Sequence, residues 1–240
     1  MKIGIPVFPG SNCDRDVEKV LTTLFKVKTE FLWYNKEKIS SDYDAIIIPG
    51  GFSFGDRLRS GIIAAHSPIM DEVKRLAKDG IPILGICNGF QILVESELLP
   101  GALIKNDSLK FMCKWSKLIV KNNKTPFTNN FKLNQTFSIP IANGEGRYVA
   151  DKETISNLQK KNQIVFQYQE NDNPGGSFES IAGICNEKGN VVGMMPHPER
   201  VFEKLLPKMG LPQDALKIFG SLTNYLGKSM ILKTKIRRGY

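Results

Sequence analysis

The stretch IPILGICNGFQILVE, residues 81–95, decides the fold. Its first six residues are nearly all apolar, as expected of a strand that is buried on both faces of a parallel sheet. Gly85, near the end of this run, forms the pattern G-x-C-x-G with Cys87 and Gly89. The segment from Asn88 onward is predicted to be a helix. A strand, a sharp turn and a helix in this order are typical of a nucleophile elbow, with Cys87 at its apex.

Strands and helices alternate on the N-terminal side of this stretch. We predict strands over residues 2–8, 28–34, 45–49 and 81–86, and helices over residues 14–25, 68–78 and 88–98. This alternation predicts a parallel sheet that is covered by helices and joined by right-handed crossovers.

The second half of the chain has a different pattern. Residues 102–150 contain short strand-like stretches, at 118–120 and 136–141, between Asn, Lys and Gly residues. Further strands are predicted over 164–168, 181–185 and 191–195, the last two joined in a hairpin, and a helix over 213–226. We therefore expect an α/β fold with a mostly parallel open sheet, helices on its faces and additional antiparallel strands. Residues 1–228 are expected to form one domain, and residues 229–240 a basic C-terminal tail.

The composition is that of an ordinary globular protein with a formal net charge of +9. The basic residues are spread along the chain without a basic stripe interleaved with aromatics, so nucleic acid is not an expected partner. There is no signal-peptide pattern and no apolar run long enough to span a bilayer, so we expect a cytoplasmic protein that does not bind membranes. The four cysteines form no CxxC pair, and with two histidines in the chain no metal site is expected.

The base that a cysteine nucleophile needs can come from one of these two histidines. His197 comes just after a predicted strand, and Glu199 lies two residues further on. Glu199 could accept a hydrogen bond from one imidazole nitrogen while the other faces Cys87, which would fix the tautomer as in catalytic triads. His66 lies at a predicted helix end and is interpreted as a surface or capping residue.

A glycine-rich turn follows the apolar strand at residues 45–49. Backbone N–H groups of Gly51 or Phe52, together with that of Asn88, are predicted to form an oxyanion hole. Gly50 and Gln91 are expected to border the substrate. The sequence has neither a Walker-type loop nor a G-x-G-x-x-G motif after a strand, so we do not expect this chain to bind ATP or a dinucleotide by itself.

These elements resemble the class I, triad-type glutamine amidotransferases, whose pattern is P-G-G, then G-x-C-x-G-x-Q, then H-P-E or H-x-E. A narrower resemblance is to the glutaminase subunit of phosphoribosylformylglycinamidine synthase, from de novo purine synthesis. It rests on PGSNCD (9–14), GGFSFGDRLRSGIIAAHSPIM (50–70), LPGAL (99–103), GEGRY (144–148) and GMMPHPER (193–200).

The resemblance implies that glutamine is hydrolysed to glutamate and ammonia through a γ-glutamyl thioester on Cys87. The ammonia would pass to a large synthetase subunit that uses ATP and Mg²⁺ and binds formylglycinamide ribonucleotide. A small third protein would bridge the two subunits. This chain itself is expected to bind no cofactor.

Two positions depart from the resemblance, Asn143 where His is expected and Gly176 where Asn is usual. Phe52, Asp56 and Arg57 are interpreted as the pocket rim or a partner contact. Cys13 is interpreted as structural, because nothing like an elbow surrounds it.

Three other interpretations remain open from the sequence. The chain could be an amidotransferase or γ-glutamyl hydrolase of another pathway, against which the long motif at residues 50–70 argues. It could be a non-catalytic relative that binds a partner, although the Cys-His-Glu set is intact. It could also be a cysteine peptidase, which would not need the spacing of Glu199.

Overall fold

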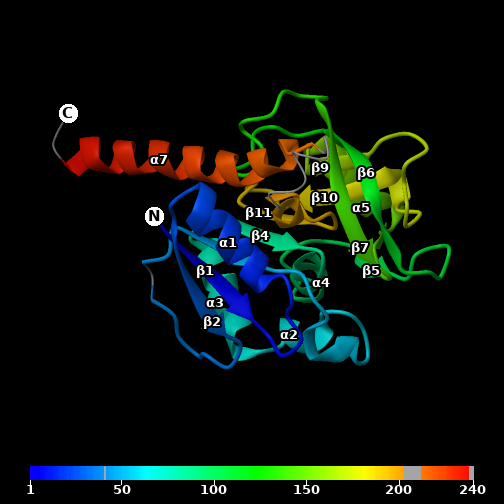
Figure 1. Ribbon diagram of the computed structural model, residues 1–240, viewed down its shortest axis with the longest axis horizontal. Helices are drawn as coiled ribbons and strands as arrows, with labels where there is room; N and C mark the ends of the chain where they lie inside the picture. Colours follow the sequence, from blue (N-terminus) through cyan, green and yellow to red (C-terminus); the bar gives the residue numbers. More distant parts are fainter. Residues whose placement is uncertain (41, 203–211, 238–240) are drawn as a thin grey trace.

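A twisted sheet runs through the computed structural model, which describes residues 1–40, 42–202 and 212–237, with side chains of the last helix up to Ser229. Among these residues nine strands form one sheet in the order β2-β1-β3-β4-β11-β10-β9-β6-β7, and two more form a small separate sheet, β5-β8. Figure 1 shows the first half of the chain at one end of the sheet and the long β6–β7 hairpin at the other.

The first five strands of the order are parallel. They are β2 (Lys28–Trp33), β1 (Lys2–Val7), β3 (Ala45–Ile48), β4 (Ile83–Ile86) and β11 (Val191–Met194). Every residue of β3, β4 and β11 is buried, which explains their continuous apolar sequences. Because Ile48 pairs with Gly85 and Ile86 with Met194, these three strands end at the same edge of the sheet.

Helices follow the parallel strands as the alternation predicts. They are α1 (Asp14–Leu24), α2 (Ile62–Ala65), α3 (Pro68–Lys78) and α4 (Asn88–Glu95). From β1 the chain moves to β2 on one side, and later from β3 to β4 on the other. Right-handed crossovers therefore put α1 and α3 on opposite faces. The carboxyl ends of β1 and β3 flank this switch in direction, where ligands bind in open α/β sheets.

The remaining strands are antiparallel. They are β10 (Ile181–Cys185), β9 (Ile164–Tyr168), β6 (Met112–Val120) and β7 (Thr136–Asn143), with β5 (Ala102–Ile104) and β8 (Arg147–Val149) beside them and α5 (Lys152–Lys160) after β8. The predicted α/β fold with added antiparallel strands is confirmed. The prediction made β6 too short and missed β5, β8 and α5.

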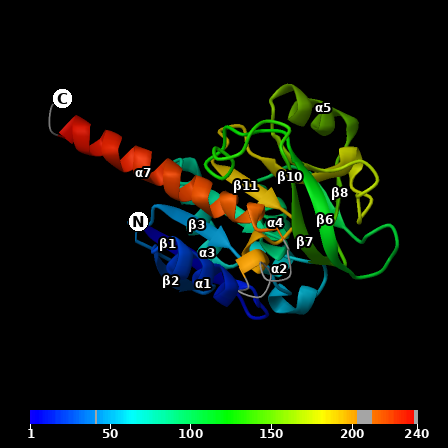
Figure 2. The same cartoon turned by 45° about the horizontal axis from the view of Figure 1, so that its top comes forward.

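The last helix, α7 (Lys217–Arg237), continues well past the predicted end at residue 226. Its first turns are held by the buried side chains of Ile218, Phe219 and Leu222. Beyond them the helix extends away from the sheet in both views (Figures 1 and 2). Most of the segment predicted as a basic tail, residues 229–240, thus has helical backbone, and residues 238–240 lie outside the described part. None of the helices in the described residues has the length and apolar character needed to cross a bilayer.

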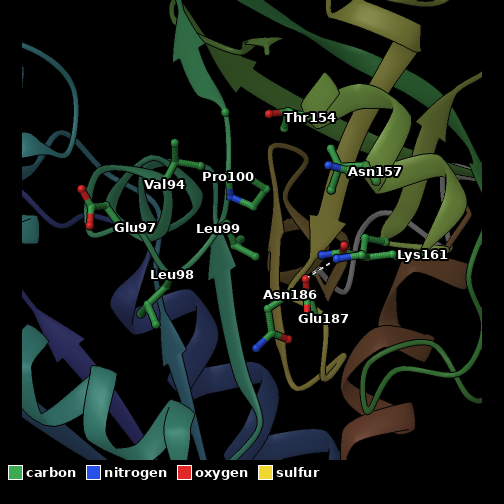
Figure 3. A pocket seen from close by; sticks show the side chains of 13 residues that line it. Val94, Glu97, Leu98, Leu99, Pro100, Thr154, Asn157, Lys161, Asn186 and Glu187 are labelled. Carbon is green, nitrogen blue, oxygen red and sulfur yellow. Dashed lines mark hydrogen bonds and ion pairs between the residues drawn. The ribbon is translucent and has the colours of Figure 1, made fainter. Parts of the chain in front are cut away.

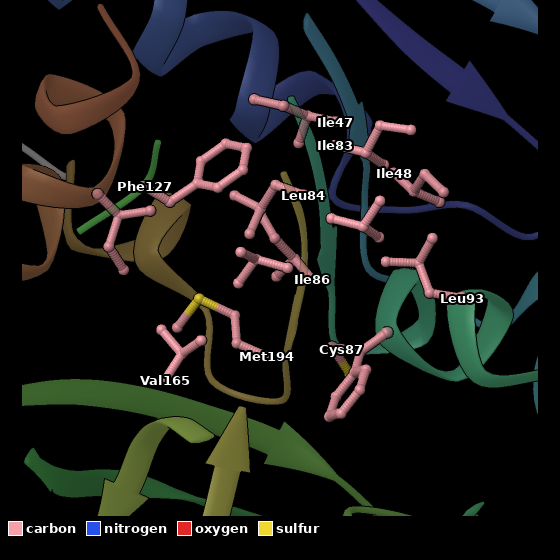
Figure 4. Close-up of a cluster of buried hydrophobic side chains, with 14 of the residues drawn as sticks. Ile47, Ile48, Ile83, Leu84, Ile86, Cys87, Leu93, Phe127, Val165 and Met194 are labelled. Atoms are coloured by element: carbon pink, nitrogen blue, oxygen red, sulfur yellow. The ribbon is translucent and has the colours of Figure 1, made fainter. Parts of the chain in front are cut away.

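The core fills the space between the central strands and their helices. Figure 4 shows side chains of β3, β4 and β11 packed together with Phe127 and Val165, and Cys87 at the point where β4 passes into α4. The turn that ends β4 is therefore anchored on one side by a rigid apolar cluster.

Candidate active site

Cys87 occupies the sharp turn between β4 and α4. Its backbone has φ 51° and ψ −106°, a combination that a non-glycine residue rarely adopts and that costs about 1–3 kcal/mol. The backbone N–H of Cys87 donates to the carbonyl of Met194 at 2.8 Å, so the turn is fixed to β11. This geometry is that of a nucleophile elbow.

The two glycines beside Cys87 are required by crowding. A β-carbon on Gly85 would lie 2.6 Å from the carbonyl oxygen of Gly89, and one on Gly89 would lie 2.1 Å from that of Ile48. These are backbone atoms that cannot move aside, so α4 packs against β3 only because residue 89 has no side chain.

His197 and Glu199 form a buried pair in the segment after β11. The imidazole Nδ1 lies 2.6 Å from Glu199 Oε1, and both side chains are almost fully buried. The backbone N–H of His197 donates to Pro140 O at 2.9 Å. The short contact to Glu199 puts a proton on Nδ1 and leaves Nε2, which has no partner among the described residues, as the nitrogen available for chemistry.

The charge of His197 is set by its neighbours. Burial by itself disfavours the charged imidazole, but the carboxylate of Glu199 and the sulfur of Cys87 outweigh burial and hold the pKa of His197 well above its usual value. An imidazolium is therefore favoured at neutral pH.

Cys87 and His197 converge on Gly50, which follows β3. A β-carbon at Gly50 would lie 2.9 Å from His197 Cε1 and 3.5 Å from Cys87 Cβ. Three strand ends thus bring the predicted thiol, the predicted imidazole and the glycine turn to one place. The imidazole of His197 thus has Glu199 at Nδ1 and the thiol of Cys87 beside its ring.

Cys13 also lies in this cluster, which the sequence did not reveal. Its sulfur is 3.9 Å from His197 Nδ1 and accepts a hydrogen bond from Arg200 Nη2 at 3.2 Å. Cys13, His197 and Glu199 have ligand atoms within 4.8 Å of one another. A metal ion is disfavoured there because Nδ1 already pairs with Glu199 and a guanidinium faces the sulfur. The contact between Cys13 and His197 arises from the tertiary fold and has no signal in the local sequence.

The predicted oxyanion donors differ in availability. The N–H of Phe52 is used in a hydrogen bond to Gly10 O at 2.9 Å. The N–H of Asn88, the first residue of α4, has no acceptor within its own helix. Gly51 has φ 154° and lies so close to residues 10–12 that a β-carbon would contact their backbone at 2.7–2.9 Å. The N–H groups of Gly51 and Asn88 have no acceptor among the described residues, so these two are the better pair of donors, and Phe52 is not available.

Gln91 serves the architecture of the site. Its side-chain oxygen Oε1 accepts a hydrogen bond from Asn88 Nδ2 at 2.9 Å, and its Nε2 donates to the backbone oxygen of Glu145 at 2.8 Å. The side chain thus ties the start of α4 to the loop between β7 and β8. Asn88 Oδ1 in turn accepts from Ser53 N at 3.1 Å, which fixes the glycine turn to the same helix.

A cavity of about 350 Å³ opens in front of Cys87 and His197. One wall comes from the parallel half, through Asn12, Gly51, Phe52, Asp56, Ser60, Cys87, Gln91, His197 and Arg200. The other comes from β6, β7 and the loop after β7, through Phe111, Cys113, Ala142, Asn143, Gly144 and Glu145. The second wall includes Glu145 and Asn143, to which the sequence had not assigned a place in the site.

A second hollow of about 470 Å³ lies at the far end of α4, between that helix, α5 and the β10–β11 hairpin. Figure 3 shows Leu99, Pro100 and Asn157 around it, with Lys161 and Glu187 forming an ion pair at its side. It contains none of the predicted site residues. His66, at the end of α2, is exposed and bonds to the backbone oxygen of Ile62, consistent with a capping role.

The comparisons with known proteins agree with this geometry. The model of the CobB/CobQ-like glutamine amidotransferase domain matches residues 1–226, and the chain belongs to this family of glutamine amidotransferases. It is therefore an enzyme of that class, and the resemblance found in the sequence is confirmed.

Within the class, the chain is similar to one from the structure of PurLQS of Thermotoga maritima. The two are 45% identical over 94% of this chain and 98% of that chain, with a TM-score of 0.82. A putative GMP synthase component from Thermoplasma acidophilum (98% of each chain) and a glutamine amidotransferase from Thermotoga maritima (95% of this chain, 97% of that one) each have a TM-score of 0.59 at 15% identity. The last two share the fold.

Proposed function

We propose that this chain is the glutaminase subunit of formylglycinamidine synthase, acting in the cytoplasm, with Cys87, His197 and Glu199 as its catalytic triad. The observation that carries the proposal is the convergence of Cys87 and His197 on Gly50 at the mouth of one cavity. The similarity to PurLQS supports the choice of pathway.

In the first half of the reaction, the Cys87 thiolate attacks the side-chain amide carbon of glutamine. The N–H groups of Gly51 and Asn88 donate to the oxyanion that forms. His197 gives the proton on Nε2 to the nitrogen as the C–N bond breaks, so that ammonia leaves and a thioester remains on Cys87.

In the second half, neutral His197 takes a proton from water, and the resulting hydroxide attacks the thioester carbon. The C–S bond then breaks, glutamate is released, and the thiolate and imidazolium are restored. Glu199 holds the imidazole in orientation throughout, through its contact with Nδ1.

The ammonia would be used by partner subunits. We propose a large synthetase subunit that binds ATP with Mg²⁺ and formylglycinamide ribonucleotide, and a small bridging subunit. This chain would supply glutamine hydrolysis and need no cofactor of its own.

The test is glutamate release from glutamine by wild type and Cys87→Ser, with and without the synthetase partners, ATP and formylglycinamide ribonucleotide. Cys185→Ser is the matched control, since burial raises the pKa of that thiol to about 12 and makes it unreactive. Release that needs Cys87 and rises in the full complex supports the proposal. Release that needs Cys87 but ignores the partners would argue against the purine assignment, and no release in any mixture would argue against catalysis.

A further inference from the structure

The cavity has an acidic end that the proposed chemistry does not use. Asp56, at the end of the turn Ser53–Asp56, lines the cavity together with Glu145 from the opposite wall. Ser60, on the same wall as Asp56, donates from its hydroxyl across the cavity to Glu145 Oε2 at 2.7 Å. The Asp56 oxygen Oδ1 is buried and has no hydrogen-bond partner among the described residues.

The negative charge at this end is not neutralised by the protein. Burial and the nearby carboxylate of Glu145 raise the pKa of Asp56, against a lowering contribution from Ser60. In the described part of the chain neither carboxylate forms an ion pair, and the neighbouring arginines Arg59 and Arg147 pair with Glu95 and Asp107 instead. A half-buried carboxylate whose buried oxygen has no partner favours a cationic ligand.

Asn143 supplies a second, independent indication of a ligand. Its side chain is 5% exposed and lines the same cavity, yet the amide Nδ2 has no acceptor among the described residues. A β-carbon on Gly146 would lie 2.2 Å from Asn143 Oδ1, so the glycine makes room for this amide. A buried donor without an acceptor costs about 1–3 kcal/mol, and a ligand carrying an acceptor would relieve this cost.

The wall that carries Asn143 lies close to the thiol of Cys87. Ala142, the residue before Asn143, has its carbonyl oxygen 3.8 Å from Cys87 Sγ. Gln91 connects the first turn of α4 to the backbone of Glu145. In glutamine, two methylene groups separate the reacting amide carbon from the carbon that carries the ammonium and the carboxylate.

We propose that Asp56, assisted by the negative charge of Glu145, binds the α-ammonium group of glutamine, and that Asn143 Nδ2 donates to its α-carboxylate. The inference rests on the proposed function, because it assigns the far end of the same substrate. Asp56 is then a specificity residue that selects free glutamine over amides without a free α-ammonium group. A site built to pair with a polar group strongly rejects analogues that lack the group.

The experiment compares two substrates in the assembled complex, L-glutamine and glutaramate, which is glutamine without its α-amino group. Wild type should prefer glutamine. In Asp56→Asn, kcat/KM for glutamine should fall by about 10²-fold, while kcat/KM for glutaramate should change by less than about threefold. Asp42→Asn is the control, because Asp42 is an exposed partner of Lys2 away from the cavity.

A second measurement covers the case in which glutaramate is hydrolysed too slowly to follow. L-glutamate and glutarate are tested for protection of Cys87 against iodoacetamide, a small reagent without an amino-acid head group. Wild type should be protected better by glutamate than by glutarate, and Asp56→Asn should lose this difference. An unchanged alkylation rate without ligand would show that the catalytic end of Asp56→Asn is intact. In Asn143→Ala, protection by glutamate should weaken. Protection by the α-amide of glutamate, which lacks the α-carboxylate, should not change.

The outcomes separate this inference from the proposed function. If wild type releases glutamate through Cys87 but does not distinguish the two substrates, or if Asp56→Asn loses both equally, the inference is wrong and the glutaminase assignment stands. A wild type that releases no glutamate in the full complex removes the proposed function and the inference together.

Discussion

The parallel and antiparallel halves of the sheet contribute differently to the site. The parallel half, β2 to β11, carries Cys87, His197, Glu199 and the glycine turn at its strand ends. The antiparallel half contributes the opposite wall, with Asn143 and Glu145. The first half therefore holds the groups that would make and break bonds, while the far end of the substrate would be recognised from both walls, by Asp56 of the first and by Asn143 and Glu145 of the second.

The two walls of the cavity are held in place by different parts of the structure. The reacting groups follow directly after buried strands whose ends are held in register by the sheet, which is the rigidity that catalysis requires. Two of the recognising groups, Asn143 and Glu145, lie at the end of β7 and in the loop that follows it. Gln91 fastens that loop to α4 by one hydrogen bond at 2.8 Å. Loops on a rigid scaffold are where specificity is commonly placed.

The strongest separation of the two functions comes from Cys87→Ala. Without the nucleophile, glutamine-dependent synthesis by the complex should fall by about 10⁴-fold or more. Ammonia-dependent synthesis should remain, because ammonia bypasses this subunit. The measurement is product formation with glutamine or with ammonium chloride as nitrogen donor. Loss of both activities would contradict the assignment of chemistry to this half.

A smaller effect is expected from Glu199→Gln, which tests the charge balance at His197. Glu199 raises the pKa of His197, so the imidazolium persists to a higher pH than in an ordinary histidine. Removing the carboxylate lowers that pKa, and the activity that requires the imidazolium should be lost at lower pH than in wild type. At neutral pH kcat should fall by about 10²-fold. A pH profile of glutamate release checks both, and an unmoved alkaline limb would argue against His197 as the acid.

The smallest effect is expected from Tyr148→Phe, in β8 of the small two-stranded sheet. The Tyr148 hydroxyl donates to Pro100 O at 2.9 Å, and its ring stacks on Phe90 of α4 with centroids 6.2 Å apart. Loss of the hydrogen bond should lower the free energy of unfolding by about 1–2 kcal/mol. Because the ring remains, kcat/KM should stay within about twofold of wild type. Urea denaturation and glutaminase assays measure the two, and a large loss of activity would mean that the packing of the small sheet on α4 affects the reacting groups.

The same contrast explains how much of the fold the sequence predicts. The parallel strands are short runs of apolar residues, and their predicted ends agree with the structure to within two residues. In β6 the polar residues Lys114, Ser116 and Lys117 interrupt the apolar ones without a regular period, and β5 and β8 have three residues each. Such strands are stabilised by neighbours distant in the chain, so local sequence carries little signal for them.

Site residues divide in a similar way. The local motifs around Cys87 and His197 predicted that both lie at strand ends, and the structure brings them together at Gly50. The position of Cys13 beside His197, and of Asn143 and Glu145 in the cavity wall, depends on contacts across the whole domain. The hydrogen bond that occupies Phe52 N–H likewise arises from Gly10, 42 residues earlier in the chain.

The backbone conformation of Cys87 sets catalysis against folding stability. A positive φ at this position is unfavourable for any residue with a β-carbon, by about 1–3 kcal/mol. Glycine would adopt the turn more readily, so a chain with glycine there would fold at least as well and lack the thiol. Selection for folding alone would thus erode the elbow, and the presence of cysteine in this conformation is a sign of selection for activity against stability.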